Sequence, residues 1–186
     1  MERNSTSVRF PIGSQLPEFA LRNVDGSQIG TRFLSSGKLA LVVFTCNHCP
    51  YVKGSESALI AVVKEFEPSG LKAVTINSND ATEYPDDSWE KMKEKSKSMN
   101  LPYPYLHDES QDVAKQFDAA CTPECYLFNS QGSLIFHGTI NDNPKDSSLS
   151  KNDLLKRAIS QALAGQTPNP DFVHPIGCSI KWKIKS

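Results

Sequence analysis

The sequence predicts an α/β fold in which helices cover both faces of a mixed central sheet. A continuous apolar run at 39–45, a stretch with helical periodicity, and a second apolar run at 71–76 form a strand–helix–strand unit. Such a unit spans about 35 residues and has a right-handed crossover. Strands buried on both faces have uninterrupted apolar runs because neither face meets water. Two later strands, 126–128 and 134–137, flank a short turn and must pair antiparallel, so the sheet is mixed.

The remaining elements are predicted in chain order. Segments 18–21 and 27–29 flank a turn in which Gly26 supplies a positive φ, so an N-terminal β-hairpin extends the fold. The helix of the strand–helix–strand unit covers 52–66, and its apolar residues recur every three or four positions. Further helices are predicted at 88–99, 108–117 and 151–163, and a short strand at 102–106.

Length and composition indicate a single domain, 1–186, with an irregular tail from about residue 166. A chain of this length buries a sizeable core without disulfide staples. The net charge of -1 gives no reason to expect a nucleic acid or a membrane surface as partner. The N-terminus lacks the apolar stretch of a signal peptide. We therefore expect a cytoplasmic protein, or an extracytoplasmic one if a precursor segment has been removed.

The five cysteines point to redox chemistry or metal binding, because an odd number in a chain of this length does not suit structural cross-linking. Cys46-Asn47-His48-Cys49 lies between the first apolar strand and the helix. Free N–H groups and the positive end of the helix dipole favour a thiolate there. We expect the pKa of Cys46 to be lowered and Cys46 to be the nucleophile. Cys49 is close enough to resolve the mixed disulfide.

The neighbours of these cysteines have predicted roles. A protonated His48 adds positive charge near Cys46 and stabilises its thiolate, which raises the reduction potential. Asn47 is neutral and is expected to add little. Pro50 falls in the first helical turn, where its missing N–H costs little. The acidic loop with Asp80, Asp86 and Asp87 is expected to be solvated.

A second group of candidate residues precedes the strand at 126–128. Pro123 is tolerated at a strand start, and a cis bond after Thr122 would present backbone groups to the cysteine pair. Cys121 is a candidate third redox thiol, a candidate metal ligand, or a small buried hydrophobe. Cys125 is expected to pack in the sheet. Cys178, in the tail, is expected to be structural, to cover the site, or to link to a partner.

These motifs carry a resemblance. The run from Phe44 to Pro50, together with Thr122-Pro123 before a hydrophobic strand, resembles the thioredoxin superfamily. The N-terminal hairpin and the insertion after the strand–helix–strand unit resemble its redoxin branch. That branch includes the alkyl hydroperoxide reductase/thiol-specific antioxidant family and extracytoplasmic thiol–disulfide oxidoreductases. The chain is most similar to bacterial members with a C-N-H-C motif and a tail like 176–183. The resemblance implies a thioredoxin-like fold, a dithiol site and a cis Pro123.

The resulting functional prediction is a thiol–disulfide oxidoreductase acting on protein or small-molecule disulfides. We expect Thr45, Pro50 and Thr122 to contact the substrate, no cofactor or bound metal, and an upstream reductase that restores the dithiol. One alternative is a peroxiredoxin-like peroxidase with antioxidant activity, although His48 stands where the peroxiredoxin signature places its cysteine. The other is a copper or zinc protein that uses Cys46, Cys49 and a third ligand from Cys121 or His48.

Overall fold

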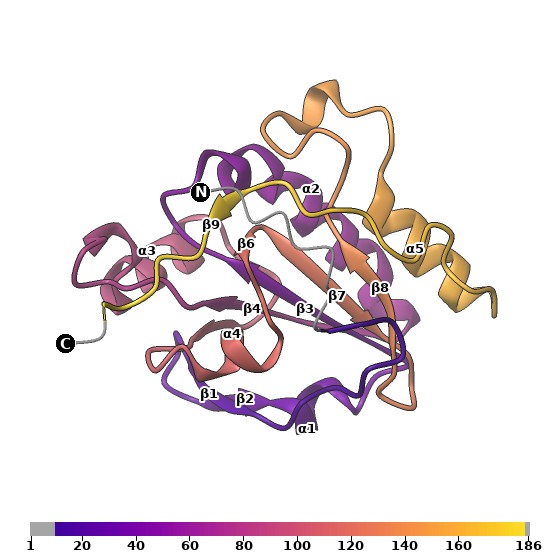
Figure 1. Cartoon of the computed structure of the whole chain (residues 1–186), viewed down its shortest axis with the longest axis horizontal. Helices are drawn as coiled ribbons and strands as arrows, with labels where there is room; N and C mark the ends of the chain where they lie inside the picture. Colours follow the sequence, from indigo (N-terminus) through magenta and orange to yellow (C-terminus); the bar gives the residue numbers. More distant parts are fainter. Residues whose placement is uncertain (1–9, 185–186) are drawn as a thin grey trace.

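The computed structural model describes residues 10–184 and has a seven-stranded sheet at its centre, in the order β2-β1-β5-β4-β3-β7-β8 (Figure 1). β3 and β4 pair parallel, as do β4 and β5. The other neighbours pair antiparallel, so the sheet is mixed, as predicted. The strands are β1 (Ala20–Asn23), β2 (Gln28–Gly30), β3 (Leu39–Thr45), β4 (Leu71–Asn77), β5 (Tyr105–His107), β7 (Glu124–Phe128) and β8 (Leu134–Gly138).

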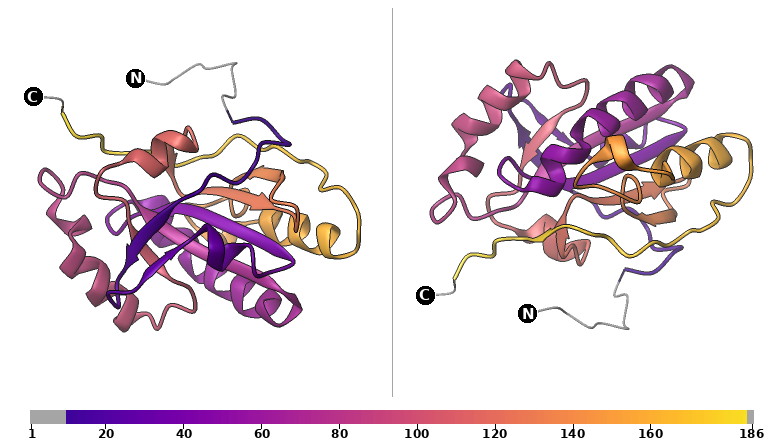
Figure 2. Two further views of the ribbon diagram at one scale, coloured as in Figure 1. Left: turned by 90° about the horizontal axis from the view of Figure 1, so that it is seen from below. Right: turned by 90° about the horizontal axis from the view of Figure 1, so that it is seen from above.

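Helices cover both faces of this sheet (Figure 2). Along β3, Leu41 and Val43 pack with residues of α2 and α5, whereas Val42 and Phe44 pack with residues of α4 and α1 on the other face. No helix within residues 10–184 combines the length and apolarity needed to cross a membrane. The helices are α1 (Thr31–Leu34), α2 (Pro50–Phe66), α3 (Trp89–Ser98), α4 (Asp112–Gln116) and α5 (Leu154–Leu163), with single turns η1 (Glu67–Ser69), η2 (Pro85–Asp87) and η3 (Ser147–Leu149).

An aromatic cluster supports the end of β3. The ring of Phe117 lies 5.3 Å from that of Phe44 and 5.2 Å from that of Tyr126, both in edge-on geometry. Such pairs contribute about 0.5–1.5 kcal/mol each beyond the area they bury. Phe44 lies two residues before Cys46, so this packing fixes the point where the cysteine motif leaves the sheet.

The parallel pairing of β3 and β4 brings two loops together. Thr45 lies opposite Asn77, so both strands end at the same edge of the sheet. The cysteine motif follows β3 there, and the polar loop that leads to η2 follows β4. In open α/β sheets this carboxyl edge is where functional sites form.

The C-terminal tail differs from the prediction, since it is not irregular throughout. It contains β9 (Cys178–Ser179), which pairs antiparallel with β6 (Cys121–Thr122) in a small second sheet. Strands of two residues have no periodicity, so the pattern could not reveal them. In Figure 1 the tail, coloured yellow, runs from α5 past β6 towards α3. It therefore crosses the same edge of the sheet as the cysteine motif.

Candidate active site

The structure brings both cysteines of the motif onto Thr122. Cys46 directly follows β3 and Cys49 is the N-cap of α2, and both are fully buried. The Cys46 sulfur lies 3.3 Å from the Thr122 hydroxyl oxygen. The Cys49 sulfur lies 3.3 Å from the Thr122 carbonyl oxygen, to which a Cys49 thiol donates. The peptide bond between Thr122 and Pro123 is cis, and Pro123 is buried.

A hydrogen bond between the two cysteine side chains shifts their pKa values in opposite directions, which leaves one proton for the pair near neutral pH. The pKa of Cys49 is lowered to about 4, chiefly by a hydrogen bond from the Cys46 thiol. The pKa of Cys46 is raised because this thiol keeps the shared proton, because it is buried, and because Asp87 is negatively charged. This reverses the prediction that the lowered pKa belongs to Cys46. When the proton is on Cys49, the Cys49 thiol can donate a hydrogen bond to the Thr122 carbonyl oxygen, and the Thr122 hydroxyl can donate to the Cys46 sulfur.

The carboxylate of Asp87 is the centre of the site's polar network. It is fully buried and Asp80 is buried as well, so the prediction of a solvated acidic loop is wrong at both residues and holds for Asp86. One carboxylate oxygen accepts from the Asn47 backbone N–H at 2.6 Å and from the Asn77 amide at 3.2 Å. The other accepts from the Asn79 amide at 2.9 Å and pairs with His48. Each of the four acceptor positions of this carboxylate is therefore occupied.

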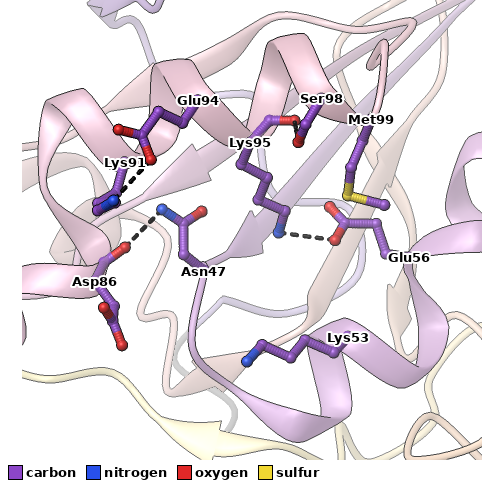
Figure 3. Close-up of a pocket in the computed structure, with 9 residues that line it drawn as sticks. All are labelled: Asn47, Lys53, Glu56, Asp86, Lys91, Glu94, Lys95, Ser98 and Met99. Carbon is purple, nitrogen blue, oxygen red and sulfur yellow. Dashed lines mark hydrogen bonds and ion pairs between the residues drawn. The ribbon is translucent and has the colours of Figure 1, made fainter.

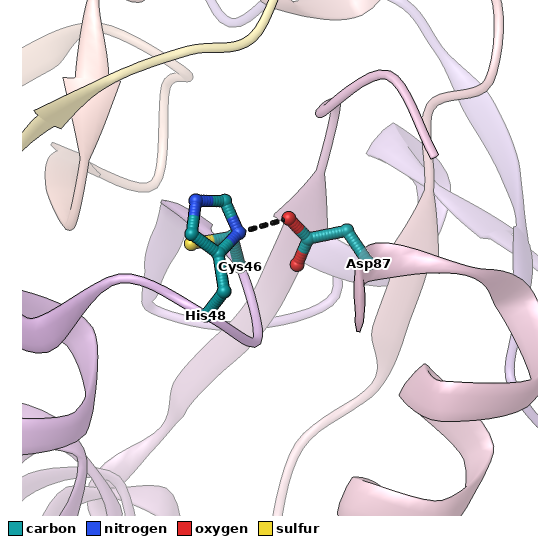
Figure 4. A group of neighbouring side chains, drawn as sticks. All are labelled: Cys46, His48 and Asp87. Atoms are coloured by element: carbon teal, nitrogen blue, oxygen red, sulfur yellow. Dashed lines mark hydrogen bonds and ion pairs between the residues drawn. The ribbon is translucent and has the colours of Figure 1, made fainter. Parts of the chain in front are cut away.

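The imidazole of His48 pairs with Asp87 rather than acting alone on Cys46. Its Nδ1 atom lies 2.5 Å from a carboxylate oxygen of Asp87, and its ring stacks on Tyr84 with centroids 5.4 Å apart. Figure 4 shows the imidazole between the carboxylate and the Cys46 sulfur. A positive charge on His48 is offset by this carboxylate. The predicted stabilisation of a Cys46 thiolate by His48 is thereby weakened.

Asn47 contributes more than the sequence suggested. Its side-chain amide donates to the Asp86 carbonyl at 2.8 Å, and its side-chain oxygen accepts from the Tyr105 hydroxyl at 2.8 Å. Its backbone N–H is held by Asp87. These three hydrogen bonds hold Asn47 against β5 and η2. Because Asn47 lies between the two cysteines, it positions the motif.

A hollow of about 620 Å³ opens beside Asn47, between α2 and α3 (Figure 3). Its wall contains Lys95, which lies 2.8 Å from Glu56 and donates to the Cys46 carbonyl at 3.1 Å. Both side chains of this ion pair are largely buried, at 13% and 6% exposed. The pair therefore connects α2, α3 and the cysteine motif next to an open, charged surface.

The other predicted site residues are placed as follows. Thr45 is buried at the end of β3, and Pro50 is exposed at the first position of α2. Cys121 lies in β6 opposite Ser179, and burial, followed by the charge of Glu124, raises its pKa. Cys125 is buried in the core, as expected. Neither Cys121 nor Cys125 takes part in the sulfur contacts with Thr122.

The substrate edge expected at Thr122 is occupied by the protein's own tail. Thr122 pairs with Cys178 of β9, and Cys178 packs against the cluster formed by Cys46, Cys49 and Val52. Covering the site was one of the roles considered for Cys178, but the 55 residues between Thr122 and Cys178 carry no local trace of its contact with the cysteine pair. Sequence reasoning missed Asp87 and Asn77. A polar run directly after a buried strand, at the edge where the motif emerges, was the available signal.

A metal site finds limited support. Within residues 10–184, one potential ligand group was found, formed by Cys46, His48 and Asp87, whose ligand atoms lie within 4.8 Å of one another. A structural zinc site needs four ligands, and Asp87 has no acceptor position left. The group contains Cys46 and His48 but not Cys49, which the metal alternative also required. The cluster suits a hydrogen-bonded network better than a metal ion.

Comparisons with known proteins agree with this architecture. The AhpC/TSA family model matches residues 12–137. An uncharacterized conserved protein from Geobacillus kaustophilus is 39% identical, with a TM-score of 0.90 over 95% of each chain. A hypothetical protein from Sinorhizobium meliloti 1021 is 32% identical, with a TM-score of 0.89 over 94% of this chain and 96% of that chain. No functionally curated protein matches the sequence.

More distant structures share the fold. A thiol:disulfide interchange protein of the thioredoxin family from Chlorobium tepidum TLS is 19% identical, with a TM-score of 0.64 over 81% of this chain and 97% of that chain. The family match covers well over half of the 186 residues and supports a redox function in general. The chain therefore belongs to the AhpC/TSA family, in the redoxin branch of the thioredoxin superfamily.

Proposed function

We propose that this protein is a thiol–disulfide oxidoreductase in which Cys46 and Cys49 alternate between dithiol and disulfide. The observation that carries the proposal is the pair of buried sulfurs that both contact one residue, Thr122. Its substrates are disulfides of proteins or small molecules. The fold that the chain shares with a thiol:disulfide interchange protein is consistent with this chemistry.

The reaction runs in two exchanges. The shared proton moves to Cys49, and the Cys46 thiolate attacks one sulfur of the substrate disulfide. The substrate S–S bond breaks, and the leaving thiolate takes the proton from Cys49. The Cys49 thiolate then attacks the Cys46 sulfur, and the second substrate sulfur leaves as a thiolate that takes a proton from water. Two electrons have passed to the substrate. A cellular reductase then supplies two electrons to the Cys46–Cys49 disulfide and restores the dithiol.

Redox titration in glutathione buffers, followed by peptide mapping, tests the proposal. Wild type and the control variant Cys125→Ser should form a Cys46–Cys49 disulfide and accelerate insulin reduction by dithiothreitol. Cys46→Ser and Cys49→Ser should reduce insulin at the uncatalysed rate, and Cys49→Ser should accumulate a mixed disulfide on Cys46. Failure of wild type to form this disulfide would overturn the proposal.

A second candidate function is a thiol peroxidase with antioxidant activity, which membership of the AhpC/TSA family favours. Peroxide would oxidise one thiol of the site to a sulfenic acid, and the second thiol would condense with it to a disulfide and release water. Peroxide consumption with dithiothreitol as donor tests this. If Cys46→Ser and Cys49→Ser consume peroxide as fast as wild type, the site is not peroxidatic.

A further inference from the structure

The C-terminal tail brings a third sulfur to the cysteine pair. In the β6–β9 ladder, Thr122 lies opposite Cys178. Side chains of directly opposed residues project to the same face of a ladder. The Thr122 hydroxyl contacts the Cys46 sulfur on that face, the Cys49 sulfur reaches the Thr122 carbonyl oxygen, and Cys178 packs against the same cluster. Cys178 therefore approaches Cys49 from the side on which an extended substrate would lie.

This approach is built into the chain. A Cβ atom on residue 177 would lie 2.1 Å from the Thr122 carbonyl oxygen, so only glycine allows the contact. Beyond the ladder, the Ile180 N–H donates to the Ala120 carbonyl at 3.0 Å, and the Lys181 N–H donates to the Asn79 side chain at 2.9 Å. Cys178 is thus held between a close backbone contact and two further hydrogen bonds.

Cys121, the other candidate for a third thiol, occupies a different position in the ladder. It is opposed to Ser179 rather than to Cys178. Neighbouring residues of a strand project to opposite faces, so Cys121 and Ser179 lie on the opposite face of the ladder from Thr122 and Cys178. The pKa of Cys178, raised to about 11 by burial and then by its contact with Cys49, indicates the proximity of those two sulfurs.

We propose that Cys178 is a third redox thiol, which exchanges with the Cys46–Cys49 disulfide to give a Cys49–Cys178 disulfide. This inference rests on the proposed function, because the first disulfide must form before the exchange. The Cys178 thiol loses its proton and attacks the Cys49 sulfur. The bond between Cys46 and Cys49 breaks, and Cys46 leaves as a thiolate that takes up the proton. No external oxidant is consumed, since one disulfide replaces another.

The exchange removes the main cause of the raised pKa of Cys46, the leaving group, while burial and the charge of Asp87 still raise it. Its pKa is raised chiefly by the hydrogen bond with the Cys49 thiolate. That thiolate no longer exists once Cys49 is bonded to Cys178. The Thr122 hydroxyl, 3.3 Å from the Cys46 sulfur, remains to stabilise the departing charge.

The test uses the full chain with Cys46→Ser, which leaves four of the five cysteines. Oxidised glutathione is added, free thiols are alkylated, and the protein is mapped without reduction. Glutathione first attaches to Cys49, and Cys178 then displaces it. We expect loss of the glutathione adduct, a Cys49–Cys178 crosslink, and alkylation of Cys121 and Cys125. The double variant Cys46→Ser/Cys178→Ser should keep glutathione on Cys49.

Two matched controls test the register. Cys46→Ser/Cys121→Ser should still form the Cys49–Cys178 crosslink. Cys46→Ser/Cys178→Ser with Ser179→Cys moves the sulfur by one residue to the other face, and it should not link to Cys49. A stable glutathione adduct in Cys46→Ser, or a Cys49–Cys121 crosslink, would overturn the inference. Failure of wild type to form the Cys46–Cys49 disulfide overturns the proposed function instead, so the two failures are distinguishable.

Discussion

At the scale of single residues, one buried carboxylate organises the loop that carries both cysteines. Asp87 accepts from the Asn47 backbone and from the side chains of Asn77, Asn79 and His48. A buried donor that loses its acceptor costs more than the hydrogen bond itself contributed. The geometry of the cysteine motif therefore depends on a residue 38 positions beyond Cys49.

Asp87→Asn should destabilise the protein. An amide has one acceptor oxygen in place of two and directs its NH₂ group at donors, so at least one buried donor loses its partner. We expect the free energy of unfolding to fall by about 1–3 kcal/mol, measured by urea unfolding of the reduced protein. Asp86→Asn is the matched control, because this neighbouring side chain is exposed. Equal midpoints for the two variants would contradict the role assigned to Asp87.

The lowered pKa of Cys49 has a measurable pH dependence. The pKa of Cys49 in the folded protein is about 4, whereas the pKa of a cysteine thiol in an unfolded chain is about 8.5. Between these values the folded protein holds a thiolate and the unfolded chain a thiol, so this group stabilises the fold increasingly as the pH rises. Its contribution is complete above the unfolded pKa and is lost as the pH falls through the folded pKa.

Thiolate absorbance near 240 nm checks this prediction in reduced wild type. We expect a step near pH 4 that is absent in Cys49→Ser. In Cys46→Ser the step should move to higher pH, because the hydrogen bond from Cys46 is the main cause of the lowered pKa. If wild type showed no step below the range of ordinary thiols, the proton sharing proposed for this pair would be wrong.

At the scale of elements, a largely buried ion pair joins α2 to α3. Lys95 pairs with Glu56 and donates to the Cys46 carbonyl, whereas Lys91 and Glu94 pair on the exposed side of α3. Buried charges depend strongly on their partners, and exposed pairs contribute little. The same helix therefore offers an internal comparison.

A double-mutant cycle with Glu56→Gln and Lys95→Met should give a coupling of about 1–3 kcal/mol in unfolding experiments. Each single variant leaves one largely buried polar group without its partner. Each should therefore lower the free energy of unfolding by more than half of the decrease caused by the double variant. The parallel cycle with Lys91→Met and Glu94→Gln should show no measurable coupling. Equal couplings would mean that burial of the Lys95–Glu56 pair has no energetic effect.

The elements were predictable where periodicity or burial on both faces leaves a local pattern. β3 was predicted with its bounds, and α2 and β4 within a few residues. α4 is shorter than predicted, since it begins only at Asp112. The preceding Asp108 is buried, and its carboxylate accepts from the N–H groups of Val113 and Ala114. Asp108 therefore caps α4 from a position before the helix begins. The sequence pattern did not distinguish this capping position from a helical one.

At the scale of the whole molecule, the tail connects parts of the chain that are otherwise separate. The tail is hydrogen-bonded to β8, because the His137 N–H donates to the Asp171 carbonyl at 2.9 Å. Further along, the tail pairs with β6. Near its end, Gln111 donates to the Lys181 carbonyl at 2.9 Å and accepts from the Lys183 N–H at 2.9 Å. The side chain of Gln111 therefore fastens the last part of the tail.

Gln111→Asn should loosen this part of the tail alone. Gln111 has a φ of 66°, a conformation that asparagine tolerates, but the shorter side chain cannot reach the same partners. We expect faster amide hydrogen exchange at Lys183, while the Ile180 amide, bonded to the Ala120 carbonyl, keeps its protection. Unchanged exchange at Lys183 would show that Gln111 does not hold the tail.

The site was predictable to the extent that its residues are close in sequence. Cys46 and Cys49 stand in one motif, and the link to Thr122 came from a resemblance. Cys121 was considered as a third thiol because it is near Pro123 in the sequence, whereas the ladder places Cys178 beside the pair. Strand register decides which side chain meets the site, and two-residue strands leave no pattern from which register can be read.

Gly177 allows the tail to lie so close to Thr122 that the tail competes with any partner for this position. A polypeptide can add a strand at Thr122 only by displacing one that belongs to the same molecule. A competitor tethered in this way acts at an effective concentration on the order of millimolar. We therefore expect loosely bound polypeptides to be excluded from Thr122, and compact disulfides, which need no strand pairing, to be unaffected by this competition.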